Sequence, residues 1–150
     1  MAGEAPDQST GRAGLLLGTE TIEVMDDDEC WRRLGAGSFG RLAILLRRGP
    51  MIFPINYAAG PDSIVFRTDV GTKLEAGPGS DGCFEIDGYD DATGFGWSVV
   101  ATGPIVLVAE EDDLRRLPVH PVAPGPHDHW LALRARTVSG RRFRTPWQSR

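Results

Sequence analysis

Residues 39–57 read FGRLAILLRRGPMIFPINY, and this stretch decides the fold class of the chain. Two apolar runs flank the turn Arg48-Gly49-Pro50, a pattern that predicts a β-hairpin. Similar short runs follow on both sides of glycine, proline and aspartate turns. They predict strands at Ser63–Thr68, Gly82–Tyr89 and Gly96–Val108, and a final strand or hairpin over 129–137 and 141–143. Gly103-Pro104 inside the longest run predicts a bulge or bend there.

The helices that we expect are few and short. Asp26 and Glu29 have the spacing of a capping box, and the helix that they begin is expected to stop at Gly35 and Gly37. Residues 71–76 and 110–117 predict at most one further short helix each. Six strands, two or three short helices and no βαβ rhythm predict a mainly β fold, an antiparallel barrel or sandwich.

Length and charge limit the organisation and the function classes. At 150 residues the chain suits one domain, placed at 21–150, while the polar residues 1–20 predict a disordered acidic tail. Residues 1–30 hold eight acids and one base, so the remaining residues are close to neutral. With one lysine and no long apolar run, the sequence predicts neither nucleic-acid binding nor a membrane span. Two cysteines and the lack of a secretory pattern predict a cytoplasmic protein.

Several motifs favour a structural explanation over a chemical one. The glycines of Gly35-Ala-Gly37-Ser-Phe-Gly40 match a dinucleotide fingerprint, but they follow a helix and precede a strand, the reverse of what that site needs. A glycine helix cap explains them better. His127-Asp128-His129 lacks the converging ligands of a metal site, so no metal is predicted. No residue stands out as an acid–base catalyst, and the catalytic residues stay unassigned.

One turn combines the groups that a phosphate needs. Arg67 and Thr68 end a predicted strand, and Thr72 and Lys73, the only lysine of the chain, open the following short helix. A guanidinium, an ammonium, two hydroxyls and free helix N–H groups together suit a phosphate dianion. A surface turn with routine charges is the alternative.

The ordered series of motifs resembles the pyridoxamine 5′-phosphate oxidase-like, flavin-binding split-barrel family. The motifs run from Glu29-Cys-Trp-Arg-Arg-Leu34 through Pro54-Ile-Asn-Tyr57, Gly71-Thr-Lys-Leu74 and Gly96-Trp-Ser-Val99 to Ser139-Gly-Arg-Arg142. The resemblance implies a six-stranded antiparallel split β-barrel and a homodimer with a cofactor cleft at each side of the subunit interface. It also implies FMN as cofactor, with the deazaflavin F420 or haem as alternatives within the same fold.

The resemblance also implies where a cofactor would bind. It assigns the phosphate to Arg67, Thr68, Thr72 and Lys73, and ring contacts to Ile55, Asn56 and Tyr57, partly through the backbone. Trp97 and Ser98 would border the cleft from a neighbouring strand or subunit, although packing in a dimer core explains Trp97 equally well. The arginine-rich C-terminal motif that binds pyridoxal phosphate in true pyridoxamine phosphate oxidases is not reproduced, so the resemblance does not extend to that activity.

Three functions remain open from the sequence. The first is an FMN-dependent or F420-dependent oxidoreductase acting on an unknown small molecule. The second is a carrier of flavin, F420 or haem without turnover, in which His120, His127 or His129 would ligate a haem iron. The third is a barrel with an empty cleft that serves as an interaction protein.

Overall fold

The computed structural model describes residues 21–68, 78–108 and 129–144. The predicted tail at 1–20, the predicted helices at 71–76 and 110–117, and the site residues Thr72 and Lys73 lie outside these ranges. One helix is present in the described part, α1 (Asp27–Ala36). The strands there are β1 (Thr21–Met25), β2 (Phe39–Leu46), β3 (Gly49–Asn56), β4 (Ala58–Ala59), β5 (Ser63–Thr68), β6 (Asp81–Asp90), β7 (Phe95–Val108), β8 (His129–Arg134) and β9 (Thr137–Arg144).

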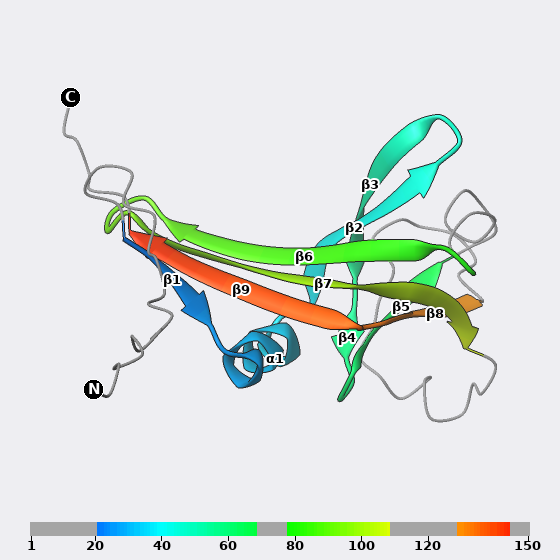
Figure 1. Cartoon of the computed structure of the whole chain (residues 1–150), viewed down its shortest axis with the longest axis horizontal. Helices are drawn as coiled ribbons and strands as arrows, with labels where there is room; N and C mark the ends of the chain where they lie inside the picture. The colour runs from blue at the N-terminus through cyan, green and yellow to red at the C-terminus, as the bar shows by residue number, and fades with distance from the viewer. Residues whose placement is uncertain (1–20, 69–77, 109–128, 145–150) are drawn as a thin grey trace, which may run out of the picture.

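The strands form one curled antiparallel sheet, which confirms the split-barrel prediction (Figure 1). The order is β3-β2-β6-β7-β8-β5-β4, and β9 and β1 extend the sheet beside the first part of β7. Its two end strands, β3 and β4, are separated in the chain by Tyr57 alone. The barrel therefore closes through one continuous segment of chain.

The described residues form nine strands where six were predicted, because the last predicted strand or hairpin is present as β8 and β9 and because two further strands occur. β4 is a two-residue continuation of β3 after a bend at Tyr57, and β1 pairs with β9, from Thr21 with Arg144 to Met25 with Gly140. No element was predicted for residues 21–25. The predicted hairpin at 39–57 is confirmed, with Gly49 at a φ of 118° in its turn, a conformation that favours glycine.

Helix α1 begins as predicted but ends later. The Asp26 side chain accepts a hydrogen bond from the Glu29 backbone N–H at 2.8 Å, which satisfies one of the free donors of the first turn. Gly35 lies within the helix, and Gly37 caps it by donating to the carbonyls of Arg33 and Leu34. Because the glycine motif caps a helix before β2, the structure has no strand–turn–helix unit at this place.

A bulge is present at the predicted position, but its extra residue lies in the chain opposite Gly103-Pro104 and not in β7 itself. β7 is continuous, but it pairs with β9 up to Thr102–Thr137 and with β8 from Ile105–Leu133. Between these pairs β7 advances three residues and its partner four, so the extra residue of the bulge lies in the β8–β9 connection. A Cβ on Gly103 would lie 1.8 Å from the Arg134 carbonyl oxygen, so only glycine fits there.

The sheet has two unlike faces. The inner face carries the hydrophobic core, in which Leu42, Phe84 and Val99 are fully buried. Helix α1 covers part of it through Cys30 and Leu34. The outer face carries the alternate residues of the same strands, since successive side chains of a strand point to opposite faces.

Candidate functional site

The two residues of β5 that were predicted to bind phosphate, Arg67 and Thr68, point to opposite faces of the sheet. Phe66 belongs to the inner core and Val65 to a smaller outer cluster with Trp130, so Thr68 points inward and Arg67 outward. Thr68 is buried at 1% exposure, whereas the half-buried Arg67 guanidinium lies 5.2 Å from the Trp130 ring centroid. A ligand beside Arg67 could therefore meet the Thr68 backbone but not its hydroxyl.

The predicted ring contacts at the end of β3 divide in the same way. Ile55 and Tyr57 are buried in the core, and Asn56 is half-buried. The Tyr57 hydroxyl donates to the Leu34 carbonyl at 2.7 Å, and burial raises the pKa of Tyr57 to about 12. Since the side chains of Ile55 and Tyr57 are used within the core, a cofactor contact at the end of β3 would use backbone groups that do not pair with β2.

The backbone of β3 is suited to such contacts. Tyr57 N–H donates to the Ser38 carbonyl, and because hydrogen-bonded residues alternate in an antiparallel ladder, Pro54 and Asn56 direct their backbone groups away from β2. Proline is tolerated at such positions because no N–H is needed there. Within the described residues, β3 pairs only with β2, so its outward carbonyls lie on the edge of the sheet.

Trp97 and Ser98 also lie on opposite faces, here of β7. Trp97 faces inward, where the Arg33 guanidinium of α1 lies 4.4 Å from its ring centroid. Its indole also packs against Gly88, where an added Cβ would come within 2.6 Å of Nε1. Ser98 faces outward, between Asp87 and Arg141 on the neighbouring strands.

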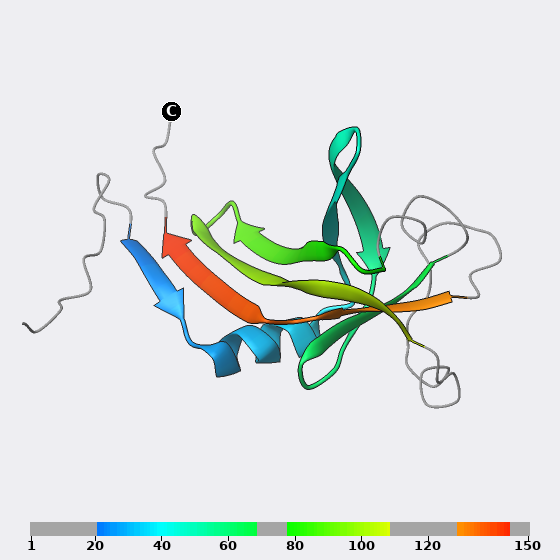
Figure 2. The same cartoon turned by 45° about the vertical axis from the view of Figure 1, so that its right-hand side comes forward.

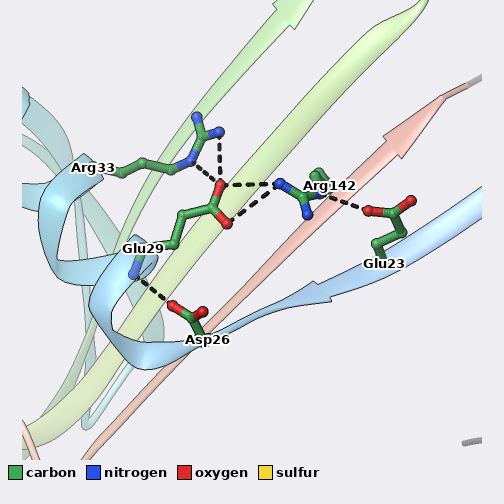
Figure 3. Close-up of polar contacts among 5 residues, drawn as sticks. All are labelled: Glu23, Asp26, Glu29, Arg33 and Arg142. Atoms are coloured by element: carbon green, nitrogen blue, oxygen red, sulfur yellow. Dashed lines mark hydrogen bonds and ion pairs between the residues drawn. The ribbon is translucent and has the colours of Figure 1, made fainter.

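The structure shows a network of ion pairs around Glu29 that was not predicted from the sequence. The Glu29 carboxylate accepts from Arg33 Nη2 at 3.1 Å and from Arg142 Nη1 at 3.3 Å, and its side chain is only 15% exposed (Figure 3). Arg142 Nε also donates to Glu23 at 2.7 Å, and this hydrogen bond together with the charge of the nearby Glu29 raises the pKa of Arg142. Glu29 and Arg142 are 113 residues apart, so no local pattern signals the contact.

A second group of charges crosses the outer face. Arg41 donates to Glu85 at 2.9 Å and to Asp87 at 3.1 Å. Burial and the neighbouring Asp87 raise the pKa of Glu85, while Arg41 opposes the shift. One guanidinium is shared by two carboxylates, so this group leaves a formal charge of −1 on the outer face.

The predicted site residues fall into two groups far apart on one chain. Arg67 pairs with Trp130, which pairs with Val108 near the end of β7, whereas Trp97 lies near the start of β7. Eleven residues separate Val108 from Trp97, about 36 Å along the strand at ~3.3 Å per residue. The two groups therefore lie toward opposite ends of β7 within one copy of the chain.

Two observations concern other kinds of site. No group of three His, Cys, Asp or Glu side chains within 21–68, 78–108 and 129–144 is arranged to hold a metal. Among the same residues no helix has the length and apolar character needed to cross a bilayer. His120 and His127, two of the three histidines considered as haem ligands, lie outside the described ranges, and His129 pairs with Thr68.

The sequence of residues 26–142 matches the profile of the pyridoxamine 5′-phosphate oxidase family. The chain belongs to this family. The chain is 29% identical over 147 residues to an uncharacterised protein of Mycobacterium tuberculosis. The alignment covers 90% of this chain and 96% of that protein.

Solved structures agree with the family assignment. This chain is 32% identical to a FAD-binding protein from Mycobacterium smegmatis, and the two structures superpose with a TM-score of 0.68. The match covers 81% of this chain and 98% of that one. A FAD-binding protein from Mesorhizobium loti has a TM-score of 0.70 at 20% identity, covering 84% and 99%. A FAD- and haem-binding protein from M. smegmatis has a TM-score of 0.51 at 13% identity, covering 77% and 74%. The last two likenesses concern the fold alone.

Proposed function

We propose that this protein binds a flavin nucleotide in a cleft shared by two copies of the chain and acts as an oxidoreductase on a small molecule. The observation that carries the proposal is the 32% identity with the FAD-binding protein of M. smegmatis, nearly the whole of which is covered. FMN and FAD share the isoalloxazine ring, the ribityl chain and the first phosphate, and these are the parts that the residues below would bind.

The end of β5 would hold the phosphate. Arg67 supplies a guanidinium on the outer face, partly removed from water by Trp130, where a charge-assisted hydrogen bond is stronger than in bulk solvent. Thr68 contributes its backbone, and Thr72 and Lys73 follow within a few residues along the chain. The backbone edge of β3 at Pro54 and Asn56 would meet the polar rim of the flavin ring.

The distance between the two residue groups supports the two-copy cleft. Arg67 and Ser98 both face outward but lie toward opposite ends of β7, about 36 Å apart along the strand, so we expect a ligand the size of FMN to take them from different copies. The bound flavin would supply hydride or electron transfer, and the protein would bind the ring, orient it and limit its access to water.

The cofactor can be identified directly. We expect the purified protein to show a flavin absorption spectrum, and cofactor released by heat to run as FMN or FAD in chromatography with mass detection. Reduction of that flavin by a nicotinamide or F420 donor supports the oxidoreductase, and a flavin that no donor reduces supports a carrier. A protein that takes up neither flavin, and instead binds F420, haem or nothing on titration, contradicts the proposal.

The phosphate assignment has its own test. Lys73→Ala and Arg67→Gln each remove one charge-assisted contact, so we expect FMN affinity to fall about tenfold to hundredfold. Riboflavin, which has no phosphate, is the matched control, because its affinity should stay the same in both variants. If the wild-type protein binds riboflavin and FMN equally well, these residues do not hold the phosphate.

A further inference from the structure

A cavity of about 430 Å³ lies where three separate segments of the chain meet. Its walls come from α1, from the turn between β4 and β5, and from the segment that joins β8 to the start of β9, and Figure 2 shows these parts next to one another. The residues that line it are Asp27, Trp31, Pro61, Asp62 and residues 135–138. Pockets that bind small molecules begin at roughly 300 Å³, so this cavity is large enough to hold one.

Hydrogen bonds and core packing fix the walls of the cavity. The Ala135 backbone N–H donates to the Asp62 carbonyl at 2.9 Å, which joins the β8–β9 segment to the β4–β5 turn. Trp31 and Val138 are half-buried and pack against the hydrophobic core. Because the three segments are already held together, a ligand would enter a formed pocket and would not have to order these walls on binding.

The charges around the cavity leave an excess of carboxylate. Arg136 Nη1 donates to both carboxylate oxygens of Asp81 at 3.2 Å, and Arg134 Nη1 lies 3.6 Å from Asp62 Oδ1. Asp27 has no ion pair with another residue in the described part of the chain. Three carboxylates therefore meet two guanidiniums, and the formal charge of −1 that remains belongs to Asp27.

An aromatic ring accompanies this carboxylate. Asp27 and Trp31 are four residues apart on α1, so their side chains lie on the same side of the helix, and both line the cavity. A carboxylate beside an indole suits an ammonium group, which forms an ion pair with the first and a cation–π contact with the second. The free N–H groups that begin α1 amount to only about half a positive charge, and the aspartates at 26, 27 and 28 exceed it.

We propose that this cavity binds a small organic cation in which a protonated primary amine is joined to an apolar group. The ammonium pairs with the Asp27 carboxylate and lies against the ring of Trp31, and the apolar group lies against Pro61 and Val138. This inference goes beyond flavin binding, because α1 covers the inner face of the sheet, whereas the residues proposed for the flavin on β5 and β7 face outward.

Two ligands that differ in charge test the chemistry of the cavity. Phenethylamine carries an ammonium group at neutral pH, and phenethyl alcohol has the same carbon skeleton with a neutral hydroxyl in its place. Calorimetric titration of the full chain should give a Kd for phenethylamine about tenfold lower than the Kd for phenethyl alcohol. In NMR spectra, phenethylamine should shift the indole N–H signal of Trp31, which is identified by its loss in Trp31→Phe.

A pair of neighbouring aspartates tests the position of the ammonium. Asp27→Asn removes the carboxylate from the cavity wall, so we expect the Kd for phenethylamine to rise about threefold to tenfold. Asp28→Asn is the matched control, because it removes the same charge from the same exposed turn of α1 but does not line the cavity. It should leave the Kd within about twofold of the wild-type value.

Equal weakening by Asp27→Asn and Asp28→Asn, equal affinity for the two ligands, or no binding of phenethylamine at millimolar concentration overturns the proposal. Titration of phenethylamine in the presence of saturating FMN separates this cavity from the flavin site. An unchanged Kd supports two separate sites, and competition between the two ligands overturns the assignment to this cavity. If phenethylamine binds as expected but no flavin does, the proposed function alone fails.

Discussion

The inner and outer faces of the sheet are made by the same strands, yet only the inner face is completed within one chain. Inward residues such as Phe84, Val99 and Ala101 have no exposed surface. Of the nine large hydrophobic residues that are exposed in the described part of the chain, six lie on the outer face: Ile22, Val24, Phe39, Leu45, Ile52 and Tyr89. Such a concentration marks an interaction surface. One chain therefore buries its inner face by itself, and most of its exposed large apolar side chains lie on the outer face.

A pair of phenylalanines tests this contrast with the largest expected effect. Phe84→Ala leaves a cavity in the inner core and should lower the free energy of unfolding by about 3–5 kcal/mol. Phe39→Ala on the outer face, where the ring is 50% exposed, should change monomer stability by less than about 1 kcal/mol but weaken self-association. Urea unfolding at low protein concentration, with sedimentation beside it, measures both. Equal destabilisation by the two variants would contradict the distinction between the faces.

A pair of glycines tests the point at which β7 changes partner. Gly103→Ala forces a methyl group onto the Arg134 carbonyl, so we expect a loss of about 3 kcal/mol in thermal or urea unfolding. Gly35→Ala, with nothing within 4 Å of the added Cβ, is the control and should stabilise α1 by about 0.5–1 kcal/mol. A tolerated Gly103→Ala would mean that the bulge can shift at little cost.

The Glu29 network tests how α1 is fixed to the inner face. Glu29→Gln leaves Arg33 and Arg142 without their shared carboxylate, and we expect a loss of about 2 kcal/mol. Asp28→Asn removes an exposed carboxylate from the same turn of the helix and should cost less than about 0.5 kcal/mol. The Arg33–Trp97 stack should also loosen in Glu29→Gln, seen as a change in tryptophan fluorescence. If the two variants behave alike, the network contributes no more than a surface charge.

Tyr57 gives the smallest effect, and it depends on pH. Tyr57→Phe removes the hydrogen bond to Leu34, for an expected loss of about 1 kcal/mol at neutral pH. Burial raises the pKa of Tyr57 from 10.0 to about 12 in the folded state, so the unfolded chain loses this proton first. Wild-type stability should therefore be full below pH 10 and fall as the pH rises toward 12. Urea unfolding at pH 8 and pH 11 should show a smaller decrease in Tyr57→Phe than in the wild type.

The elements predicted well are those that local sequence determines. The hairpin at 39–57 follows from two apolar runs and a glycine turn, and α1 follows from Asp26 and the acids of its first turn. β1 was missed because residues 21–25 gain their strand conformation from β9, and Glu23 and Arg142 are 119 residues apart. Propensity in a five-residue window cannot report a partner at that distance.

Candidate site residues could be named from the sequence, but the face of the sheet to which each side chain points could not be predicted. Neighbours such as Arg67 and Thr68, or Trp97 and Ser98, look like one site in the sequence, yet a strand sends them to opposite faces. Tyr57 was predicted as a ring contact, and the structure shows its hydroxyl donating to the Leu34 carbonyl of α1, 23 residues earlier in the chain. Which face each residue takes depends on the register of distant strands, which local patterns do not contain.

The pairing of β1 with β9 also bears on how the chain is made. β1 is synthesised before every other described strand, but its only pairing partner among them, β9, comes last. Contacts between residues so far apart in sequence slow folding, because the chain must close a long loop before they form. During synthesis, the pairing of β1 with β9 and the hydrogen bonds of Glu23 and Glu29 with Arg142 therefore form only after Arg142 has left the ribosome. The edge of the sheet formed by β1 is completed only when the first and the last described strands meet.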